Sequence, residues 1–361
     1  MATANETVKV ALIGYGYVGK TFHAPLIGAV PQLKLAVVSS SSPGKVRADL
    51  PEALVVSDPL AVAAHPDVQL VVIASPNATH APLATAALRA GKHVVVDKPF
   101  TLTLAEAREL AALAASQNRV LSVFQNRRWD SDFLALRAVL AEGRLGEVLH
   151  FDSHFDRFRP EVRARWREQD GPGAGIWFDL GPHLIDQVLQ LFGLPETVSA
   201  SLISQRPGAQ TTDWAHAVLN YGRRQVVLHA AMLVAGGFPR FAVHGTAGSW
   251  VKWGLDTQED QLKAGTRPGA PGWGVDPQAA TLHVGATGEQ IAIPGPAGNY
   301  PEYYRAVHAA VTGLGVNPVP PAQAVAVMAV LEAAQESAVS GRVQPLALSD
   351  GERQQFSESL R

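Results

Sequence analysis

The segment Val8–Gly19 reads VKVALIGYGYVG, an apolar run that ends in the pattern Gly14-x-Gly16-x-x-Gly19. A short apolar run closed by glycines is typical of a buried parallel strand that enters a tight turn. Between a strand and a helix this pattern indicates dinucleotide binding. The glycines allow the turn, let the backbone approach a pyrophosphate and permit close helix packing, and the helix N-terminus offers free N–H groups to the phosphates. We therefore expect a dinucleotide-binding domain to begin here.

Four more apolar runs follow, and helical patterns lie between them. The runs span Leu33–Val38, Val68–Ala74, His93–Val96 and Val120–Phe124. The helical patterns carry Leu83, Ala87 and Leu88, and then Leu104, Leu110 and Leu113. Strands that alternate with helices of about 10 to 15 residues indicate right-handed βαβ units and a sheet covered on both faces. We predict an α/β Rossmann domain with a doubly wound parallel sheet over residues 1–124.

After Gln125 the pattern changes to alternation of apolar and polar residues. In Val148–Phe158, one face carries His150, Asp152, His154 and Asp156, and the other carries Phe151, Ser153 and Phe155. Further alternating runs span Val198–Ser204, Ala215–Tyr221, Gln225–Leu233 and Arg240–Val243. Such alternation is typical of antiparallel strands with one polar face.

Helices interrupt and follow these strands. We predict a helix over Pro182–Phe192, because proline suits a first helical turn and Gly193 suits a C-terminal end. Residues 254–300 are expected to be loops with a hairpin around Thr281–Ile293, followed by helices over Pro301–Gly313 and Pro321–Ser340. The second domain is therefore predicted to be α+β over residues 125–345, for substrate binding and oligomerisation, with a tail at 346–361.

The composition narrows the kinds of partner. The chain has 361 residues, of which 47% are hydrophobic and 17% charged, with a net charge of -2. With this net charge the chain has no excess of positive charge to bind nucleic acid or anionic lipid, so we expect a small-molecule ligand. The absence of cysteine excludes disulfides, iron–sulfur clusters, Cys-ligated zinc and a thiol nucleophile. The sequence shows no apolar core of a signal peptide and no long apolar run, so we expect a cytoplasmic protein.

The end of the second predicted strand bears on the choice of cofactor. An acidic residue about 20 positions past the glycine motif would hold the ribose 2'-OH of NAD. This chain instead has Ser39–Ser42 there, with Lys45 and Arg47 close behind. Hydroxyls and cations favour a 2'-phosphate, so NADP is predicted over NAD. The alternative is that the serines form only a polar loop and that either cofactor is used.

Three residues are candidates for catalysis. Lys98 follows Asp97 at the carboxyl end of the fourth predicted strand, and ligands bind at this edge of open α/β sheets. The alternative is that Lys98 is an ordinary surface lysine, as most lysines are. Asp179 and His183 lie around the predicted start of the helix at Pro182, where a carboxylate can be a cap and a histidine can stay neutral. Oxidation of an alcohol needs a group to take the hydroxyl proton and a cation to stabilise the alkoxide.

The whole pattern resembles the Gfo/Idh/MocA oxidoreductases, the glucose-fructose oxidoreductase and inositol dehydrogenase family. The matching segments are Gly14–Gly19 (GYGYVG), Ser75–His80 (SPNATH), Ala90–Pro99 (AGKHVVVDKP) and Gly175–Asp186 (GIWFDLGPHLID). The likeness extends to a tail signature at Pro318, Ala324, Leu331 and Ser337. Four more segments look most like the subgroup with NADP-dependent scyllo-inositol dehydrogenase: Phe22–Ile27, Gln125–Asp130, Asp156–Pro160 and Ala164–Arg167.

The resemblance implies Lys98, Asp179 and His183 as the catalytic trio, and a second domain with an open antiparallel sheet that builds homodimers or homotetramers. In many members a Glu stands where this chain has Asp97, which puts that contact in doubt. The predicted cofactor contacts are Gly14, Gly16, Tyr17, Val18, Gly19, Ser39, Ser40, Lys45, Ser75, Pro76, Asn77, His80, Asp97, Lys98 and Asn126. The predicted substrate contacts are Lys98, Asn126, Asp156, Trp166, Asp179 and His183.

Two polar clusters invite other interpretations. The arginines at 157, 159, 163, 165 and 167 are suited to an anionic substrate, but Asp156, Glu161, Glu168 and Asp170 interleave with them, which favours a salt-bridged loop. Trp166 among them suits the wall of a sugar pocket. The polar face of Val148–Phe158 has two histidines and two aspartates, but a spacing of two residues along a strand separates them too far to chelate one ion together, so no metal is expected. Tyr303 and Tyr304 are interpreted as packing residues.

The residues and the resemblance together predict an NADP-preferring oxidoreductase, with NAD use left open. It would transfer hydride between nicotinamide and a secondary alcohol or ketone of a cyclic polyol or sugar. The alternatives are an aldose dehydrogenase that acts at the anomeric carbon, and a nicotinamide-sensing regulator. A sensor need not keep Lys98 and His183 together, and this chain has both.

Overall fold

A computed structural model describes residues 6–361 and divides the chain into two compact units. The N-terminal unit comprises the chain up to Trp129 together with residues 258–273 and 299–325. The C-terminal unit comprises residues 130–257, 274–298 and 326–361. Residues 258–273 and 299–325, expected in the second domain, belong to the N-terminal unit, and residues 346–361, expected as a separate tail, belong to the C-terminal unit.

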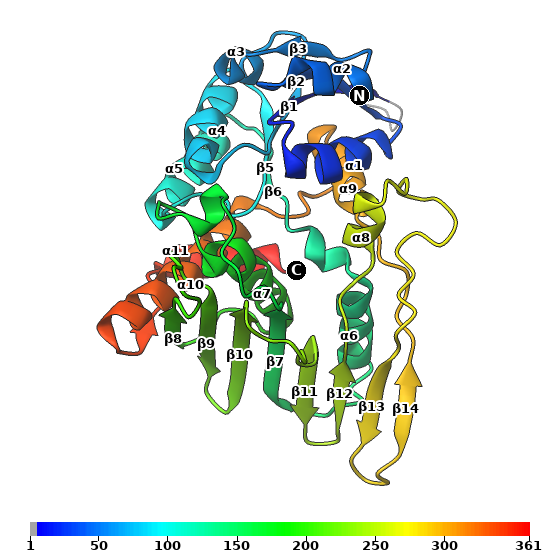
Figure 1. The fold of residues 1–361 in the computed structure, drawn as a ribbon, viewed down its shortest axis with the longest axis vertical. Helices are drawn as coiled ribbons and strands as arrows, with labels where there is room; N and C mark the ends of the chain where they lie inside the picture. The colour runs from blue at the N-terminus through cyan, green and yellow to red at the C-terminus, as the bar shows by residue number, and fades with distance from the viewer. Residues whose placement is uncertain (1–5) are drawn as a thin grey trace. The chain divides into compact units, whose positions relative to one another are not determined.

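The N-terminal unit contains one sheet of six parallel strands in the order β3-β2-β1-β4-β5-β6 (Figure 1). The strands are β1 Val8–Ile13, β2 Leu33–Ser39, β3 Leu54–Val56, β4 Leu70–Ile73, β5 His93–Val96 and β6 Leu121–Val123. The chain order reverses between β1 and β4, and ligands bind at such a switch point in doubly wound sheets. The predicted Rossmann sheet is confirmed, and β3 is an additional strand.

Helices cover both faces of this sheet, with α4 and α5 on one side and α1 and α9 on the other (Figure 1). The helices are α1 Ala24–Gly28, α2 Pro43–Asp49, α3 Pro59–Ala63, α4 His80–Arg89, α5 Leu104–Ser116, α8 Gln258–Lys263 and α9 Pro301–Val311. A π-helical turn, Gly19–His23, precedes α1. Every residue of β4 is buried, as expected for a strand with helices on both faces.

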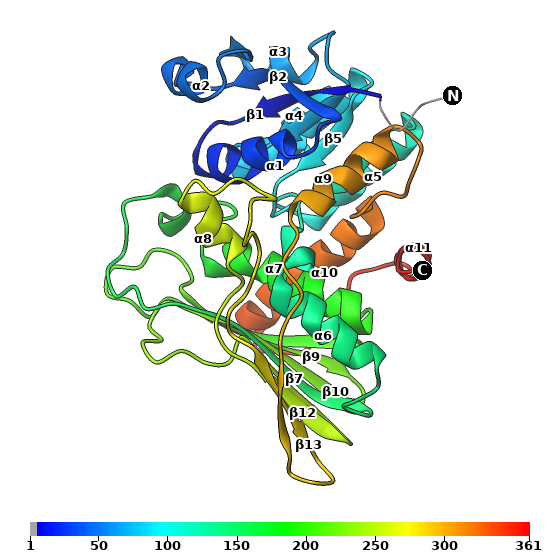
Figure 2. The same cartoon turned by 90° about the vertical axis from the view of Figure 1, so that its right-hand side faces the viewer.

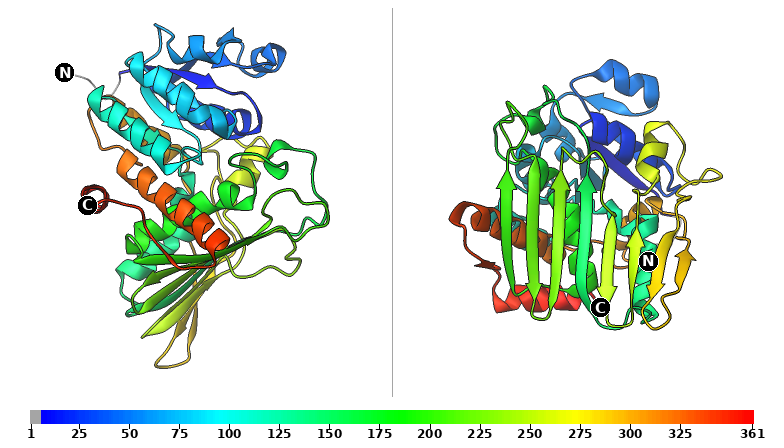
Figure 3. Two further views of the ribbon diagram at one scale, coloured as in Figure 1. Left: turned by 90° about the vertical axis from the view of Figure 1, so that its left-hand side faces the viewer. Right: turned by 60° about the horizontal axis from the view of Figure 1, so that its bottom comes forward.

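The C-terminal unit contains a sheet of nine strands in the order β14-β13-β12-β11-β7-β10-β9-β8-β15 (Figure 3). The strands are β7 Val148–Asp156, β8 Thr197–Ile203, β9 Trp214–Tyr221, β10 Arg224–Ala231, β11 Phe241–Gly245, β12 Gly248–Lys252, β13 Ala280–Val284, β14 Gln290–Ile293 and β15 Gln344–Pro345. All neighbours are antiparallel except β7 and β10, which are parallel. The predicted mainly antiparallel sheet is confirmed.

One face of this sheet is apolar and the other is polar. Along β7, Phe151, Ser153 and Phe155 are buried, and the residues between them are only partly buried or exposed. The helices α6 Ser131–Ala141, α7 Ile176–Phe192 and α10 Pro321–Ser340 lie on one side of the strands (Figure 2), and α11 Asp350–Ser359 follows β15. The prediction that this sheet builds homodimers or homotetramers stays a prediction.

The helix predicted from Pro182 begins earlier, at Ile176, so that prediction of its start was wrong. Gly175 precedes the helix with a φ of +87°, and the N–H of Ile176 donates to the Thr212 carbonyl at 2.7 Å. Pro182 therefore lies inside the helix, where its ring removes one backbone hydrogen bond. The buried apolar side chains of α7 offset that loss, because tertiary packing provides most helical stability.

None of the helices in residues 6–361 is both long enough and apolar enough to cross a membrane.

Candidate active site

The three glycines of the first loop meet different surroundings. Gly14 has a φ of +98°, and a Cβ there would lie 2.6 Å from the Ala74 carbonyl oxygen. A Cβ on Gly19 would collide with the Gly14 carbonyl oxygen, so this glycine permits the close approach of helix and strand. A Cβ on Gly16 would meet no atom within 4 Å, so the backbone there faces open space. This is the arrangement that a pyrophosphate requires.

The serines after β2 are held by local hydrogen bonds. The Ser39 carbonyl accepts the N–H of Gly14 at 3.0 Å, and its buried hydroxyl donates to the Ser57 carbonyl at 3.4 Å. The half-buried Ser40 accepts the N–H of Ser42 at 3.0 Å through Oγ. Lys45 lies exposed on α2. The end of β2 is therefore a hydroxyl-rich turn beside the glycine loop.

A carboxylate that was not predicted as a site residue, Asp49, lies near this loop. Asp49, at the end of α2, accepts a hydrogen bond from the Tyr15 hydroxyl at 3.2 Å and pairs with Lys20 at 2.6 Å. The hydrogen bond from Lys20 lowers the pKa of Asp49, and burial together with the Asp49 charge raises the pKa of Tyr15 to about 12. Asp49 lies 10 residues beyond Ser39, so the spacing rule for an acidic residue did not point to it.

The loop after β4 is tied to the loop after β5 by His80. The ring of His80 is buried, with Nδ1 at 2.8 Å from the Pro99 carbonyl and Nε2 at 3.0 Å from the Ser75 carbonyl. Burial lowers the pKa of His80, although the Asp97 charge and the hydrogen bonds to the two carbonyls oppose this. Asn77 is also buried in this loop, at the start of a short 3-10 helix after Pro76.

Asp97 and Lys98 lie directly after β5, as predicted, and the Lys98–Pro99 peptide bond is cis. Asp97 is buried, and its Oδ1 lies 3.6 Å from Nε2 of His23. Burial raises the pKa of Asp97, but His23 and the charge of Lys98 lower it more, so the net pKa is below its ordinary range. His23 was not singled out from the sequence as a site residue, and its Nδ1 lies 2.6 Å from the Tyr304 hydroxyl.

The two tyrosines of α9 explain why 299–325 belongs to the N-terminal unit. Both Tyr303 and Tyr304 are fully buried, as predicted for packing residues, and they also form hydrogen bonds. The Tyr303 hydroxyl donates to Ser122 Oγ at 3.0 Å, and Phe124 contacts both tyrosine rings. Asn126, a predicted cofactor contact, follows Phe124 by two residues. It is buried at the start of the turn Asn126–Trp129.

The catalytic pair predicted in the C-terminal unit lies on one face of α7. Asp179 is in the first turn and His183 follows four residues later, so the two side chains are neighbours on the helix surface. The Asp179 carboxylate lies 3.6 Å from Arg167 Nε and is partly exposed, whereas His183 is buried. Because α7 begins at Ile176, His183 is not in the first turn, and the argument that the helix dipole keeps it neutral was wrong.

The structure separates Asp156 from this pair. The ring centroid of Phe155 lies 6.4 Å from that of His183, so Phe155 faces α7. Asp156 follows on β7 and turns to the other face of the sheet, where its carboxylate lies beside His154 and His229. Its predicted contact with substrate has no support from this geometry.

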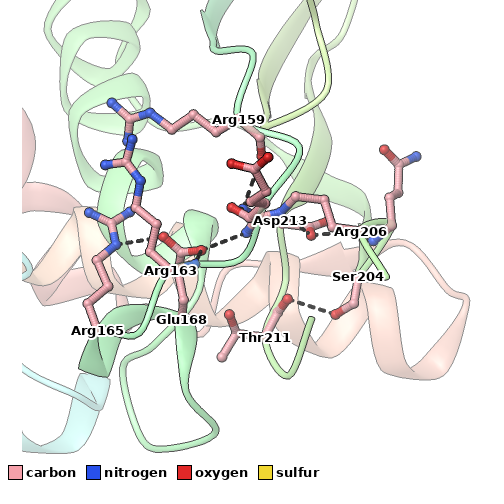
Figure 4. Close-up of polar contacts among 10 residues, drawn as sticks. Arg159, Arg163, Arg165, Glu168, Ser204, Arg206, Thr211 and Asp213 are labelled. Atoms are coloured by element: carbon pink, nitrogen blue, oxygen red, sulfur yellow. Dashed lines mark hydrogen bonds and ion pairs between the residues drawn. The ribbon is translucent and has the colours of Figure 1, made fainter. Parts of the chain in front are cut away.

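The arginine segment forms a salt-bridged loop, as predicted, but its centre is a residue that sequence reasoning missed (Figure 4). Buried Arg206 pairs with Glu168 at 3.0 Å and with Asp213 at 2.9 Å. Glu168 also pairs with Arg165 at 2.6 Å. Burial raises the pKa of Glu168, but the hydrogen bonds from Arg163, Arg165 and Arg206 lower it more. Arg206 lies about 40 residues after Glu168, so no local spacing linked them.

This loop borders a pocket beside Asp179 within the C-terminal unit. The pocket is lined by Arg165, Arg167, Glu168, Gly175, Ile176, Asp179, Arg206, Thr211, Thr212, Asp213 and Met232. Trp166 is 38% exposed, and the Arg167 guanidinium lies 4.6 Å from the centroid of its ring. The exposed tryptophan therefore lies next to the arginine that contacts the candidate catalytic carboxylate.

A parallel sheet with a dinucleotide glycine loop, a lysine at its carboxyl edge, and an Asp/His pair on a helix of a second unit define an NAD(P)-dependent oxidoreductase. Residues 8–125 match the family model described as "Oxidoreductase family, NAD-binding Rossmann fold", and residues 137–348 match "Oxidoreductase family, C-terminal alpha/beta domain". The chain belongs to the Gfo/Idh/MocA oxidoreductase family. It is an NAD(P)-dependent dehydrogenase of that family.

Individual relatives match over nearly the whole chain. The oxidoreductase YdgJ of Escherichia coli is 56% identical, with 92% of this chain and 97% of that protein covered. The scyllo-inositol 2-dehydrogenase (NADP(+)) IolW of Bacillus subtilis is 37% identical, with 93% of this chain and 95% of that protein covered. A crystal structure from Klebsiella pneumoniae, described as that of an oxidoreductase, is 56% identical, covers 99% of this chain and 100% of its own, and has a TM-score of 0.93.

Proposed function

We propose that this dehydrogenase prefers NADP and interconverts a secondary alcohol and the corresponding ketone of a cyclic polyol or sugar. The observation that carries the proposal is the Asp179–His183 pair, one turn apart on α7. A buried imidazole beside a partly exposed carboxylate is suited to move a proton during alcohol oxidation. The relative IolW is named as a scyllo-inositol 2-dehydrogenase that uses NADP(+), and this supports the substrate class.

The residues of the N-terminal unit fit a dinucleotide. The open space at Gly16 accommodates a pyrophosphate, and Gly14, Gly19 and the following helical turn would hold it through backbone N–H groups. Ser75, Pro76 and Asn77 would contact the ribose near the nicotinamide, and His80 holds their loop in place. When bound, the cofactor supplies the ring carbon that accepts or releases hydride.

The NADP preference rests on the turn after β2. Ser40 places a half-buried hydroxyl where an acidic residue would hold the 2'-OH of NAD, Ser39 contributes its backbone beside it, and the described turn Ser39–Ser42 contains no carboxylate. The exposed Lys45 adds a cation on α2. A dianionic 2'-phosphate gains charge-assisted hydrogen bonds in such surroundings. The neighbouring Asp49 does not cancel this, because Lys20 neutralises it.

The proposal gives each catalytic side chain one role. His183 takes the hydroxyl proton in oxidation and returns it in reduction. The Lys98 ammonium stabilises the negative charge that develops on the substrate oxygen. Asp179 orients and tunes the acid/base group, and its own position is fixed by Arg167. Trp166 offers an exposed aromatic face to the C–H groups of a sugar or cyclitol ring.

The test is a panel of inososes, sugar ketones and aldoses assayed with NADPH and with NADH. We expect turnover with a cyclic ketone and NADPH, and a loss of about 100- to 10,000-fold in His183→Ala and His183→Asn with little change in cofactor affinity. His150→Gln is the matched control, because His150 lies in the same unit on the polar face of β7. Lys98→Met should also reduce turnover.

Three outcomes would contradict parts of this proposal. Near-normal rates in both His183 variants would make that residue structural. Turnover of aldoses in place of cyclic ketones would favour the aldose dehydrogenase. Tight NADPH binding without turnover of any substrate would favour a nicotinamide-sensing regulator.

A further inference from the structure

The polar face of the C-terminal sheet carries a row of histidines from three neighbouring strands. His154 of β7 pairs in register with His229 of β10, which pairs in register with His216 of β9. Residues paired across neighbouring strands turn to the same face of a sheet. The ring centroids of His154 and His229 are 5.1 Å apart, and those of His216 and His229 are 5.5 Å apart. The three imidazoles therefore lie side by side.

Asp156 completes the cluster from the same face. Its Oδ2 lies 3.1 Å from Nδ1 of His154, and its Oδ1 lies 3.6 Å from Nε2 of His229. The Asp156 side chain is only 4% exposed, and no described residue donates a hydrogen bond to its Oδ1. A buried carboxylate oxygen without a hydrogen bond is costly unless a charged partner compensates it.

We propose that His154, Asp156 and His229 bind a divalent transition-metal ion of the zinc type, with water in the remaining position. One ligand atom from each of the three residues lies within 4.8 Å of the other two. The ring nitrogens beside the Asp156 carboxylate are Nδ1 of His154 and Nε2 of His229. Each histidine nitrogen lies beside its own oxygen of Asp156, at 3.1 Å from Oδ2 and at 3.6 Å from Oδ1, and each distance is close to the edge of about 3.3 Å expected for a tetrahedron with metal–ligand bonds of about 2.0 Å. Two imidazoles and one carboxylate are a donor set suited to zinc and its neighbours.

The surroundings prepare His229 to be a ligand. Its Nδ1 lies 3.3 Å from Nδ1 of His216, which leaves Nε2 directed at Asp156. One ring nitrogen then donates to the other, and His229 can keep its proton on Nδ1 and its lone pair on Nε2. Such an outer contact is what fixes the tautomer of a metal-bound histidine.

Two aromatic rings contact the cluster. The Phe238 ring stacks on His154 at a centroid distance of 5.0 Å, and the Trp214 ring meets His229 edge-on at 5.3 Å. The burial of the Asp156 and His229 side chains strengthens the attraction between an ion and these ligands. The ion would cross-link the parallel strands β7 and β10, the one parallel contact between described strands of this sheet.

The expectation of no metal considered β7 alone. The two His–Asp pairs of that strand are indeed separate, since His150 contacts Asp152 and His154 contacts Asp156. The third ligand comes from β10, and only the register of β10 against β7 brings it there. The site is independent of the proposed dehydrogenase activity, because its side chains lie on the face of the sheet opposite to Phe155.

The test uses full-length, tag-free protein that has been treated with a chelator and then titrated with Co²⁺ and with Zn²⁺. We expect about one ion per chain, visible absorption typical of four-coordinate Co²⁺, and a higher unfolding temperature, because the ion binds only the native state. Asp156→Asn and His229→Gln should each weaken binding by at least about 100-fold, and His216→Gln by about 10- to 100-fold. His150→Gln is the matched control, because its ring also contacts an aspartate, Asp152, at 2.8 Å, and it should bind like the unmodified protein.

Equal binding by the unmodified protein, Asp156→Asn and His229→Gln would overturn the site, as would the absence of Co²⁺ absorption at millimolar metal. Loss of binding in His150→Gln with normal binding in Asp156→Asn would place the ion elsewhere and also overturn it. Circular dichroism checks the fold of each variant. If Asp156→Asn fails to fold, His229→Gln still decides the question, because it leaves the carboxylate in place.

Discussion

The two sheets of this chain distribute polar side chains in opposite ways. The parallel sheet of the N-terminal unit is apolar on both faces, and its functional candidates gather where strands end, as Ser39 at the end of β2 and Asp97 directly after β5 show. The mixed sheet of the C-terminal unit has a polar face, where His154 and His229 lie in mid-strand. A parallel sheet buried on both faces has no other place for polar groups, whereas an antiparallel sheet can present them along every strand.

The difference decides which site residues a sequence can reveal. In the N-terminal unit a motif that follows an apolar run lies at the carboxyl edge by necessity, so the positions of Gly14–Gly19 and Lys98 at that edge could be predicted from the chain alone. In the C-terminal unit the clusters depend on register and on distant loops. Substitutions in one unit at a time, with the other unit unchanged, test this difference.

The largest expected effect is on the stability of the C-terminal unit. Arg206 is buried between Glu168 and Asp213, so Arg206→Met leaves two buried carboxylates without their shared cation. Breaking a buried pair in this way costs about 3–5 kcal/mol. The control is Arg223→Met, since Arg223 is 75% exposed in its pair with Glu147 and should contribute less than about 1 kcal/mol.

Urea unfolding measures both variants, followed by tryptophan fluorescence. Similar midpoints for the two variants would show that the arginine loop is not a structural network. NADPH affinity should stay unchanged in both, because the residues exchanged lie outside the N-terminal unit.

The second effect concerns the N-terminal unit and appears at low pH. Glu259 of α8 pairs with Arg127 and with Lys263. Burial raises the pKa of Glu259, but the charges of Arg127 and Lys263 lower it more, to about 2, below an ordinary value of 4.5. A lowered pKa means that the stabilisation is present above about pH 4.5 and is lost as the pH falls toward 2. The full contribution is roughly 3 kcal/mol.

The measurement is the free energy of unfolding of unmodified protein and Glu259→Gln between pH 7 and about pH 3. Glu259→Gln should be less stable at pH 7, and the difference between the two proteins should shrink as the pH falls. Glu302→Gln is the control, because its pair with Arg305 is half-exposed. A difference that stays constant with pH would show that the Glu259 carboxylate is not held by charge.

Lys98, the start of α7 and Arg206 show which features of the structure could be predicted from the sequence. Lys98 was placed correctly after β5, because a strand followed by a motif fixes a position along one chain segment. The start of α7 was misplaced, because Pro182 resembled a helix start and the contact that fixes the true start, Ile176 to Thr212, is tertiary. Arg206 was missed, because its partners lie in a loop that only the fold brings near. Features that depend on neighbouring residues could be predicted from the sequence, and contacts between distant segments could not.

The third effect tests whether cofactor binding belongs to the N-terminal unit alone. Gly16→Val should weaken NADPH binding by at least about 100-fold, because the new side chain would fill the space that a pyrophosphate needs. The protein itself can accept the change, since a Cβ there meets no atom within 4 Å. Fluorescence titration gives the affinity, and near-ultraviolet circular dichroism reports on the C-terminal unit. Unchanged affinity in a folded variant would remove the glycine loop from the site.

The smallest effect is on the choice between cofactors, and it is tested at Ser40. The Ser40 Oγ accepts the N–H of Ser42, and an aspartate can accept the same hydrogen bond, so Ser40→Asp should keep the turn. The added carboxylate repels a 2'-phosphate and can bind a 2'-OH, so the affinity ratio of NADP to NAD should fall by about tenfold or more, or about 1.4 kcal/mol. Exposed Ser41→Asp is the control for added charge alone. Parallel titrations with both cofactors give the ratios. Tighter binding of NAD than of NADP by the unmodified protein would reverse the assignment. Equal changes in the affinity ratio in Ser40→Asp and Ser41→Asp would show that added negative charge near the turn causes the effect, and not a contact between Ser40 and the 2'-phosphate.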